Sequence, residues 1–202
     1  VWNRETDIYG RMRILLDYAV NLQRNIKNPD RLRDVVANYN PPASWRPRKA
    51  DKASVYRTFW KYYLRQVIIK REWVELAGLC ESILYGSGYD DIESEYRTYC
   101  RLYAYEYENI LSYFVFRYFL KGVFDRDVLT KVKMAIVSTL MIMQCDMAVR
   151  KRNGGSLSFT ERVDIAHLYS REVEHSEENF AALCKLFAHK KVFDEAGLDA
   201  LL

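Results

Sequence analysis

The sequence predicts an all-α fold, a multi-helix bundle of mostly antiparallel helices with short connections. Apolar residues recur at three- and four-residue steps along most of the chain, as at Ile8, Met12 and Leu15. No sustained alternation of apolar and polar residues is present, and no Asn-Gly or Asp-Gly turn joins two alternating segments. Because the helical segments follow one another closely, neighbouring helices are expected to pack together.

Local signals mark where these helices begin and end. Asn28–Pro29 ends the first and begins the second, and Gly154–Gly155 stops a later one. Asp90 is expected to cap a helix with Glu93 three residues later, and Ser158 with Glu161 has the capping-box form. The expected helices are residues 6–26, 29–37, 51–70, 72–85, 91–124 with room for one break, 127–153 and 158–189.

The chain length of 202 residues suits one large domain or two small ones. We expect a single helical domain over residues 1–202. The proline-containing loop at 38–50 is the one plausible boundary, which would leave a minor N-terminal subdomain at 1–45. The chain opens without methionine inside a helical pattern, so it is expected to be a fragment of a longer protein.

Charge and hydropathy argue against two classes of partner. The net charge is only +4 with both signs interspersed, so nucleic acid is not an expected partner. The most apolar stretch, Met134–Val149, is interrupted by Ser138, Thr139, Gln144 and Asp146, which predicts a buried core helix and no membrane span. With no visible signal peptide, a cytoplasmic location is expected, and the oligomeric state is left open.

Four cysteines, Cys80, Cys100, Cys145 and Cys184, are spread widely along the chain. They form no Cys-x-x-Cys pair, so a zinc or iron–sulfur site built from this chain alone is not expected. Each lies in an apolar helical context, which predicts four reduced and mostly buried thiols.

The last expected helix carries a polar stripe. His167, Arg171, His175 and Glu178 are spaced by four, four and three residues, and Glu174 lies at the edge of the same stripe. The simplest interpretation is a solvated face with weak ion pairs. A second is a buried polar network that faces a cleft, in which Arg171 fixes Glu174 and His175 exchanges a proton near neutral pH.

A third interpretation of this helix is a metal site. Glu172-x-x-His175 has the form found in carboxylate-bridged di-iron bundles. Those sites need a second such motif from another helix, and this chain has three histidines and no second copy. No metal-ligating residues are therefore assigned.

The aromatic segment offers a second candidate surface. Tyr99, Tyr103 and Tyr107 recur at four-residue steps along one side, and tyrosines at such spacing are usually core residues with their hydroxyl groups at the rim. The alternative is a pocket wall whose aromatic faces hold a cation, such as a lysine ammonium or a sulfonium. The polar and aromatic residues that would form it are Tyr107, Asn109, Tyr113, Arg117 and Tyr118.

Four segments together resemble the C-terminal half of the flagellin lysine-N-methylase family. They are Tyr107–Tyr113, Arg117–Phe119, Lys131–Lys133 leading into Ser138, and Tyr169–Asn179. The Ser-Arg-Glu-Val-Glu-His-Ser run within the last segment is the most specific part. The resemblance is clear over residues 99–187 and general before them.

This resemblance implies a bacterial methyltransferase that moves methyl groups from S-adenosylmethionine to lysine side chains of flagellin. Members of the family resemble one another also in a cysteine-rich N-terminal region that would hold a metal or iron–sulfur centre. That region is missing here, so such a centre is expected only outside this chain. No Gly-rich strand–turn–helix is present to hold the donor in the doubly wound manner.

For this activity, the polar stripes on the two helices are expected to face each other. Glu174 or His175 would take the proton of the amine or orient it, and Arg171 would act as a clamp. Tyr107, Tyr113 and Tyr118 would form pocket walls, and Asn109 and Arg117 would hold polar parts of donor or substrate.

Two rival functions remain open at this stage. One is a non-catalytic helical protein-interaction module that docks flagellin or another partner through its aromatic face. The other is a metal-dependent oxidase.

Overall fold

The structure is a computed structural model that describes residues 6–43, 45 and 49–202. Every regular element in these ranges is a helix, which confirms the all-α prediction. The chain divides into two compact units that alternate along the sequence. Unit 1 comprises Val1–Lys49, Ala104–Ser138 and Phe187–Leu202, and unit 2 comprises Ala50–Tyr103 and Thr139–Leu186. The single domain, the subdomain at 1–45 and the antiparallel arrangement stay predictions.

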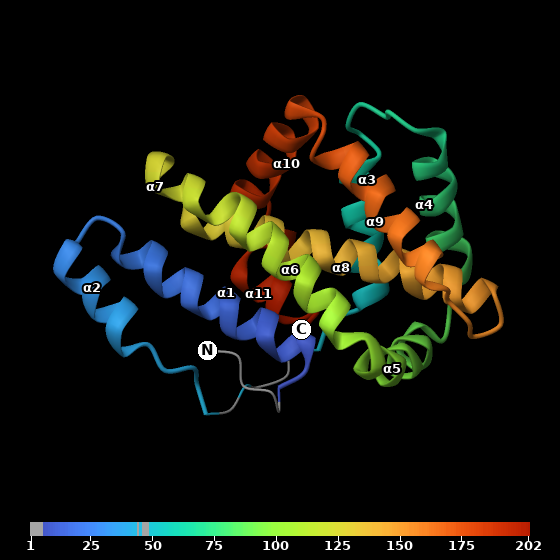
Figure 1. The fold of residues 1–202 in the computed structure, drawn as a ribbon, viewed down its shortest axis with the longest axis horizontal. Coiled ribbons are helices and arrows are strands. Elements are labelled where there is room, and N and C mark those ends of the chain that lie inside the picture. The colour runs from blue at the N-terminus through green and yellow to red at the C-terminus, as the bar shows by residue number, and fades with distance from the viewer. Residues whose placement is uncertain (1–5, 44, 46–48) are drawn as a thin grey trace. The chain divides into compact units, whose positions relative to one another are not determined.

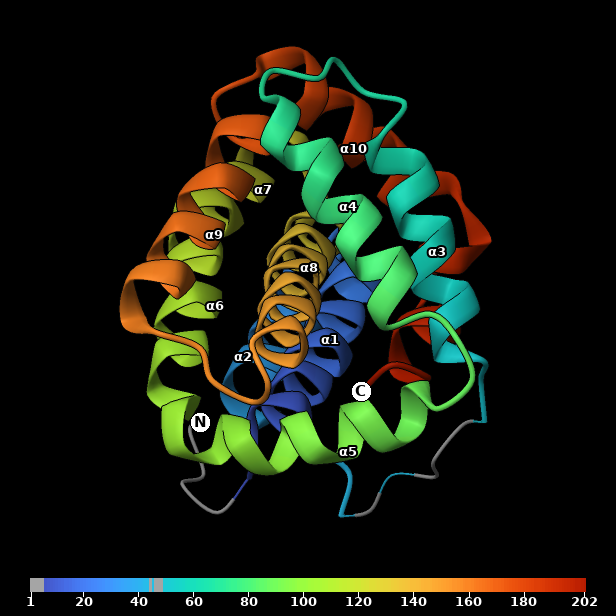
Figure 2. The ribbon, with the colours of Figure 1, turned by 90° about the vertical axis from the view of Figure 1, so that its right-hand side faces the viewer.

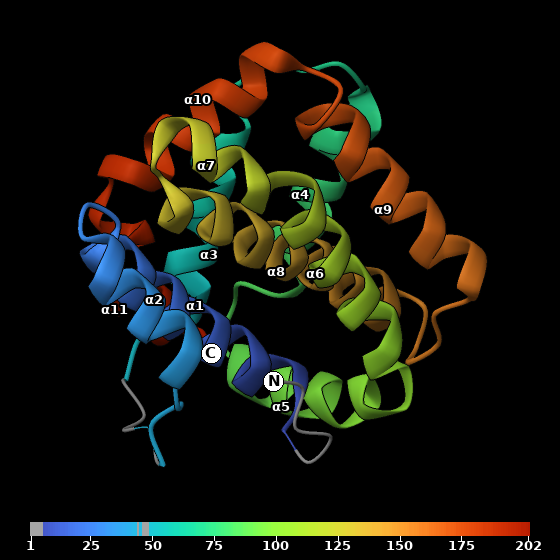
Figure 3. The ribbon, with the colours of Figure 1, turned by 60° about the vertical axis from the view of Figure 1, so that its left-hand side comes forward.

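Unit 1 is built on α1 (Ile8–Asn25), against which α2 (Pro29–Asn38) packs (Figures 1 and 3). Both helices lie within two residues of their predicted bounds. The Asp7 side chain caps α1 by accepting a hydrogen bond from the Gly10 amide at 2.8 Å, and Asn28 caps α2 in the same way. The other elements of unit 1 are α6 (Ala104–Tyr118), α7 (Gly122–Asp125), α11 (Glu195–Asp199), two 3-10 turns and the first part of α8 (Val128–Arg152).

Two ion pairs join α1 to other helices of unit 1. Arg11 pairs with Glu108 of α6 at 2.6 Å, and Arg13 pairs with Asp199 of α11 at 2.8 Å. All four side chains are largely buried, so these pairs are better shielded from salt than surface pairs.

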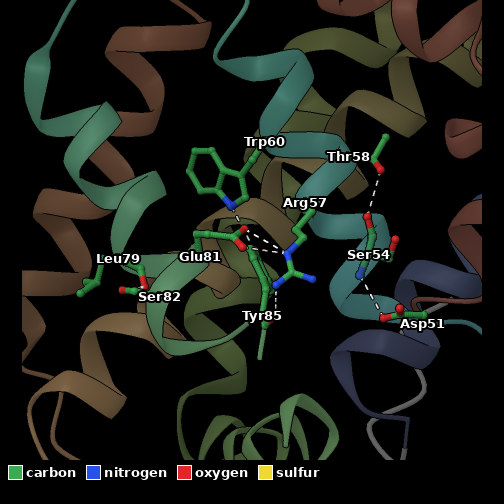
Figure 4. A network of polar contacts seen from close by, with 9 residues as sticks. All are labelled: Asp51, Ser54, Arg57, Thr58, Trp60, Leu79, Glu81, Ser82 and Tyr85. Carbon is green, nitrogen blue, oxygen red and sulfur yellow. Dashed lines mark hydrogen bonds and ion pairs between the residues drawn. The ribbon is translucent and has the colours of Figure 1, made fainter. Parts of the chain in front are cut away.

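Unit 2 contains α3 (Lys52–Tyr63), α4 (Arg71–Ile83), α5 (Tyr89–Cys100), the rest of α8, α9 (Phe159–Val173) and most of α10 (Glu177–His189). Figure 4 shows how α3 is tied to α4 and to the residues that follow it. Arg57 pairs with Glu81 at 2.8 Å and also donates to the Tyr85 carbonyl oxygen. The Trp60 indole donates to the Tyr85 hydroxyl at 3.0 Å in the core.

The start of α5 differs from the prediction that Asp90 caps it. The capping position is Gly88, whose φ of 102° favours glycine, and no side chain caps the helix there. Glu93 is buried and pairs with Lys52 at 2.9 Å and Arg97 at 3.0 Å. The Glu93 carboxylate therefore binds these two cations and does not accept from a backbone N–H at the start of the helix, as the expected capping box requires.

The aromatic segment predicted as one helix over 91–124 is divided further than expected. A 3-10 turn at Arg101–Tyr103 separates α5 from α6, and another at Phe119–Lys121 separates α6 from α7. The capping box at Ser158 and the helix stop at Gly154–Gly155, where both glycines have positive φ, are confirmed.

The expected core helix is α8. By length and composition α8 could cross a membrane, but its most apolar stretch is entirely buried inside the structure. Cys80, Cys100 and Cys145 are buried, Cys184 is half-buried, and none of the four forms a disulfide, as predicted.

Replacing Ser158 with alanine is expected to destabilise the protein by about 1 kcal/mol, because the Glu161 amide loses its capping acceptor. Urea unfolding measures the change. Ser158→Thr is the control, since threonine keeps the hydroxyl that accepts from the Glu161 amide and donates to the Glu161 carboxylate, and it should leave stability close to wild type. Equal loss in both variants would show that the cap contributes nothing.

Candidate functional site

The segment that most resembles the methylase family, Tyr169–Asn179, spans the end of α9 and the start of α10 (Figure 2). Helix α9 ends at Val173 and α10 begins at Glu177, so residues 174–176 form a turn. The prediction of one continuous helix over 158–189 is therefore wrong at this point.

Hydrogen bonds on both sides of the turn explain the break. The amides of Glu174 and His175 both donate to the Ser170 carbonyl oxygen, at 2.7 and 3.1 Å, which closes the last turn of α9. The Ser176 hydroxyl then accepts from the Asn179 amide at 3.2 Å and caps α10. Ser176 is a helix-start signal placed inside an otherwise helical pattern.

Two buried polar side chains of this segment, Glu172 and Asn179, bind the backbone of a distant stretch of chain. The carboxylate of Glu172 accepts from the amides of Ile69 and Lys70, at 3.0 and 2.5 Å. The side-chain oxygen of Asn179 accepts from the backbone N–H of Val67 at 2.9 Å, and its side-chain nitrogen donates to the Val67 carbonyl oxygen at 2.8 Å. It also donates to the Glu172 carbonyl oxygen at 2.7 Å, which bridges the turn.

We call residues 67–70 the anchored segment. Its backbone is held by buried side chains, whereas the side chains of Val67, Ile68 and Ile69 are 51, 38 and 45% exposed. The prediction of a helix over 51–70 is wrong for this stretch, since α3 ends at Tyr63. Three consecutive β-branched residues disfavour a helix and were the local signal for this ending.

An aromatic cluster packs beneath the turn and the anchored segment. The hydroxyl groups of Tyr63 and Tyr169 form a hydrogen bond of 2.9 Å in the core. The Trp73 ring lies 5.8 Å from the Tyr169 ring and 4.7 Å from the Trp60 ring. Burial raises the pKa of Tyr63 well above its usual range, so this phenol stays neutral at physiological pH.

The structure places the predicted catalytic residues at the surface of unit 2. Arg171 and His175 are exposed, and Glu174 is half-buried in the turn. Glu172 is buried against the anchored segment while His175 is exposed, so the Glu172-x-x-His175 pair does not present both groups to one ion. Within the described ranges, no group of three or more His, Cys, Asp and Glu side chains is arranged to hold a metal ion.

The predicted binding residues all lie on α6 in unit 1. Tyr107 and Tyr118 are buried, whereas Asn109, Tyr113 and Arg117 are exposed. The Arg117 guanidinium lies 5.9 Å from the Tyr113 ring and 5.7 Å from the Tyr118 ring, and its Nε donates to the Tyr118 hydroxyl. A cation of the chain itself thus already contacts these aromatic rings.

Comparison with known families decides what this chain is related to. The model of the FliB lysine N-methylase C-terminal domain matches residues 1–199. The chain belongs to this family. The methylase domain thus extends well beyond residues 99–187, over which the resemblance is clear from the sequence. No curated protein and no solved structure matches the chain.

Binding of S-adenosylmethionine, the methyl donor implied by the resemblance, by the predicted α6 residues stays a prediction. Cavities of about 410 and 260 Å³ are formed by other residues, and none of the five lines either one. Two of the five are buried, and Arg117 contacts the rings that a sulfonium would need. The catalytic candidates of the methylase domain belong to unit 2 and these five to unit 1, so their facing one another stays a prediction.

Replacing Glu172 with glutamine is expected to destabilise the methylase domain by about 2 kcal/mol, because the new amide nitrogen opposes a backbone N–H donor. The free energy of opening, measured by hydrogen exchange at the amides of Ile69 and Lys70, should fall by a similar amount. Glu177→Gln is the matched control, since Glu177 is an exposed carboxylate in the same segment. Unchanged exchange at both amides would contradict the role of the Glu172 carboxylate in holding the anchored segment.

Proposed function

We propose that this domain is part of a lysine N-methylase that transfers methyl groups from S-adenosylmethionine to lysine side chains of flagellin. The family match over residues 1–199 carries the proposal. The structural support is the turn at 174–176, which is fixed on both sides and exposes polar groups suited to proton transfer.

Lysine methylation requires a neutral amine. A lysine side chain has an ordinary pKa of about 10.4 and is protonated at neutral pH, so its nitrogen has no lone pair to attack with. A proton acceptor within hydrogen-bond reach supplies the neutral amine. The donor, when bound, supplies an electrophilic methyl group whose bonding electron pair leaves with sulfur.

We assign the proton acceptor to Glu174 or His175 of the turn. Both belong to the three residues between α9 and α10, where the exposed imidazole of His175 can meet a side chain of another protein. The bridge between Asn179 and the Glu172 carbonyl oxygen fixes the turn, so these groups need little reordering when the substrate arrives. Arg171, one turn earlier on α9, is a positioning residue.

The exposed α6 residues Asn109, Tyr113 and Arg117 are proposed to contact the protein substrate. Their exposure and the cation near Tyr113 suit a protein surface better than an enclosed donor. In this proposal these three residues hold the substrate and take no part in the transfer of the proton or the methyl group.

A non-catalytic interaction module is the second candidate. The observation that favours it is the anchored segment, which holds three apolar side chains outward at a fixed geometry. In this case the chain would bind a partner through Val67, Ile68 and Ile69, and substitutions in the turn would leave methylation unchanged.

Substitution of His175 or Glu174 by alanine is expected to lower the rate of flagellin methylation about 100-fold, because proton transfer loses its acceptor. The assay uses the chain with its natural flanking sequence, flagellin and isotope-labelled donor, followed by mass spectrometry.

The matched control for this test is His167→Ala, an exposed histidine two turns earlier on α9. Its methylation rate should equal that of wild type. Full activity of both turn variants would refute the assignment of the proton acceptor. An inactive wild-type protein would refute the methylase function itself.

A further inference from the structure

A groove of about 260 Å³ lies between α4 and α9 in unit 2. The two helices meet where the anchored segment leads into α4, and they diverge from there in Figure 2. The floor of the groove is apolar and is formed by Leu76 and Leu79 of α4 and by Ile165 and Leu168 of α9.

The rim of the groove is acidic. Glu72 and Glu75 stand on α4 and Asp164 on α9, and Arg152 is the one cation among the lining residues. Glu75 already pairs with Arg71 at 3.1 Å. Glu72 and Asp164 are exposed and form no ion pair or side-chain hydrogen bond within the described part of the chain.

An apolar floor between two free carboxylates fits a ligand with a long apolar stem and a positive end. A lysine side chain has this form, because its four methylene groups pack on apolar surface while the ammonium stays near water and charge. The acidic rim disfavours phosphate groups, so nucleic acid and anionic lipid do not fit this groove.

We propose that the groove between α4 and α9 binds a lysine side chain of the protein substrate, separate from the lysine that is methylated. Asp164 precedes Glu174 by ten residues, which corresponds to roughly 15 Å at the rise of an α-helix. A lysine held in the groove therefore places the turn at a set distance along the substrate. The groove would select lysines that have a second lysine at this spacing.

This inference rests on the proposed function, since it takes flagellin as the substrate. The test measures binding of purified monomeric flagellin to the protein with its natural flanking sequence by biolayer interferometry. The double variant Glu72→Gln/Asp164→Asn is expected to bind about tenfold more weakly than wild type. Both side chains are exposed, so the thermal unfolding midpoint should match that of wild type.

The control variant Asp90→Asn/Asp91→Asn removes the same charge from exposed positions on α5 and should bind like wild type. Equal binding by wild type and the groove variant would overturn the groove site. An equal loss of binding in both variants would also overturn the groove site, because the change in net charge would then explain the whole effect.

A second arm uses flagellin whose lysines have been acetylated, which removes the ammonium charge and leaves arginine intact. The penalty of the groove variant should vanish with this ligand. A persisting tenfold penalty would overturn the assignment to lysine and indicate an arginine. Methylation of untreated flagellin by the wild-type protein is recorded in parallel, so a failure of the proposed function is seen separately.

Discussion

The geometry of unit 2 depends on two buried side chains that bind backbone. A buried carboxylate is costly unless its oxygens are hydrogen-bonded, and Glu172 meets this requirement with the amides of Ile69 and Lys70. Asn179 serves both the donor and the acceptor of Val67. Together these bonds hold the end of α9 and the start of α10 against the entry to α4, so moving any one of these elements would leave buried polar groups without partners.

The candidate functions of unit 2 follow from this arrangement. The bonds of Glu172 and Asn179 fix one end of α4 and one end of α9. The turn at 174–176 therefore lies at the end of a rigid helix, and the acidic groove lies between two rigid walls. Sites carried by rigid elements keep their geometry better than sites on free loops. The part of the sequence most specific to the family thus combines an internal structural role, for Glu172 and Asn179, with exposed groups available for chemistry.

Sequence reasoning succeeded where a structural signal is local. The bounds of α1 and α2, the capping box at Ser158 and the stop at Gly154–Gly155 depend on residues within one or two helical turns of each other. The same reasoning extended α3 through residue 70 and joined α9 to α10. Local signals for both endings were present, namely the β-branched residues at 67–69 and the capping residue Ser176, and both were overlooked. The hydrogen bonds that join these two stretches, more than 100 positions apart, could not be read from the sequence.

For the candidate site, the sequence singled out the segment Tyr169–Asn179, and the catalytic roles assigned within it stay predictions. The spacing of His167, Arg171 and His175 indicated a polar face, and the structure places these three side chains at the surface. No spacing rule could reveal that Glu172 and Asn179 are buried, or that Glu72 and Asp164 stand across one groove. The contact between Arg117 and the tyrosines of α6 could have been predicted from the sequence, because Arg117 lies one helical turn after Tyr113.

The sequence by itself determined the all-α class, the buried character of α8, the thiol state of the cysteines and the family to which the chain belongs. These properties follow from composition, helical periodicity and motifs that can be read in one dimension. Only the tertiary structure decided which polar residues are buried and where the groove forms. These features depend on contacts between residues that are distant in the sequence. Buried polar groups need hydrogen-bond partners, and only the folded chain shows which distant backbone groups supply them.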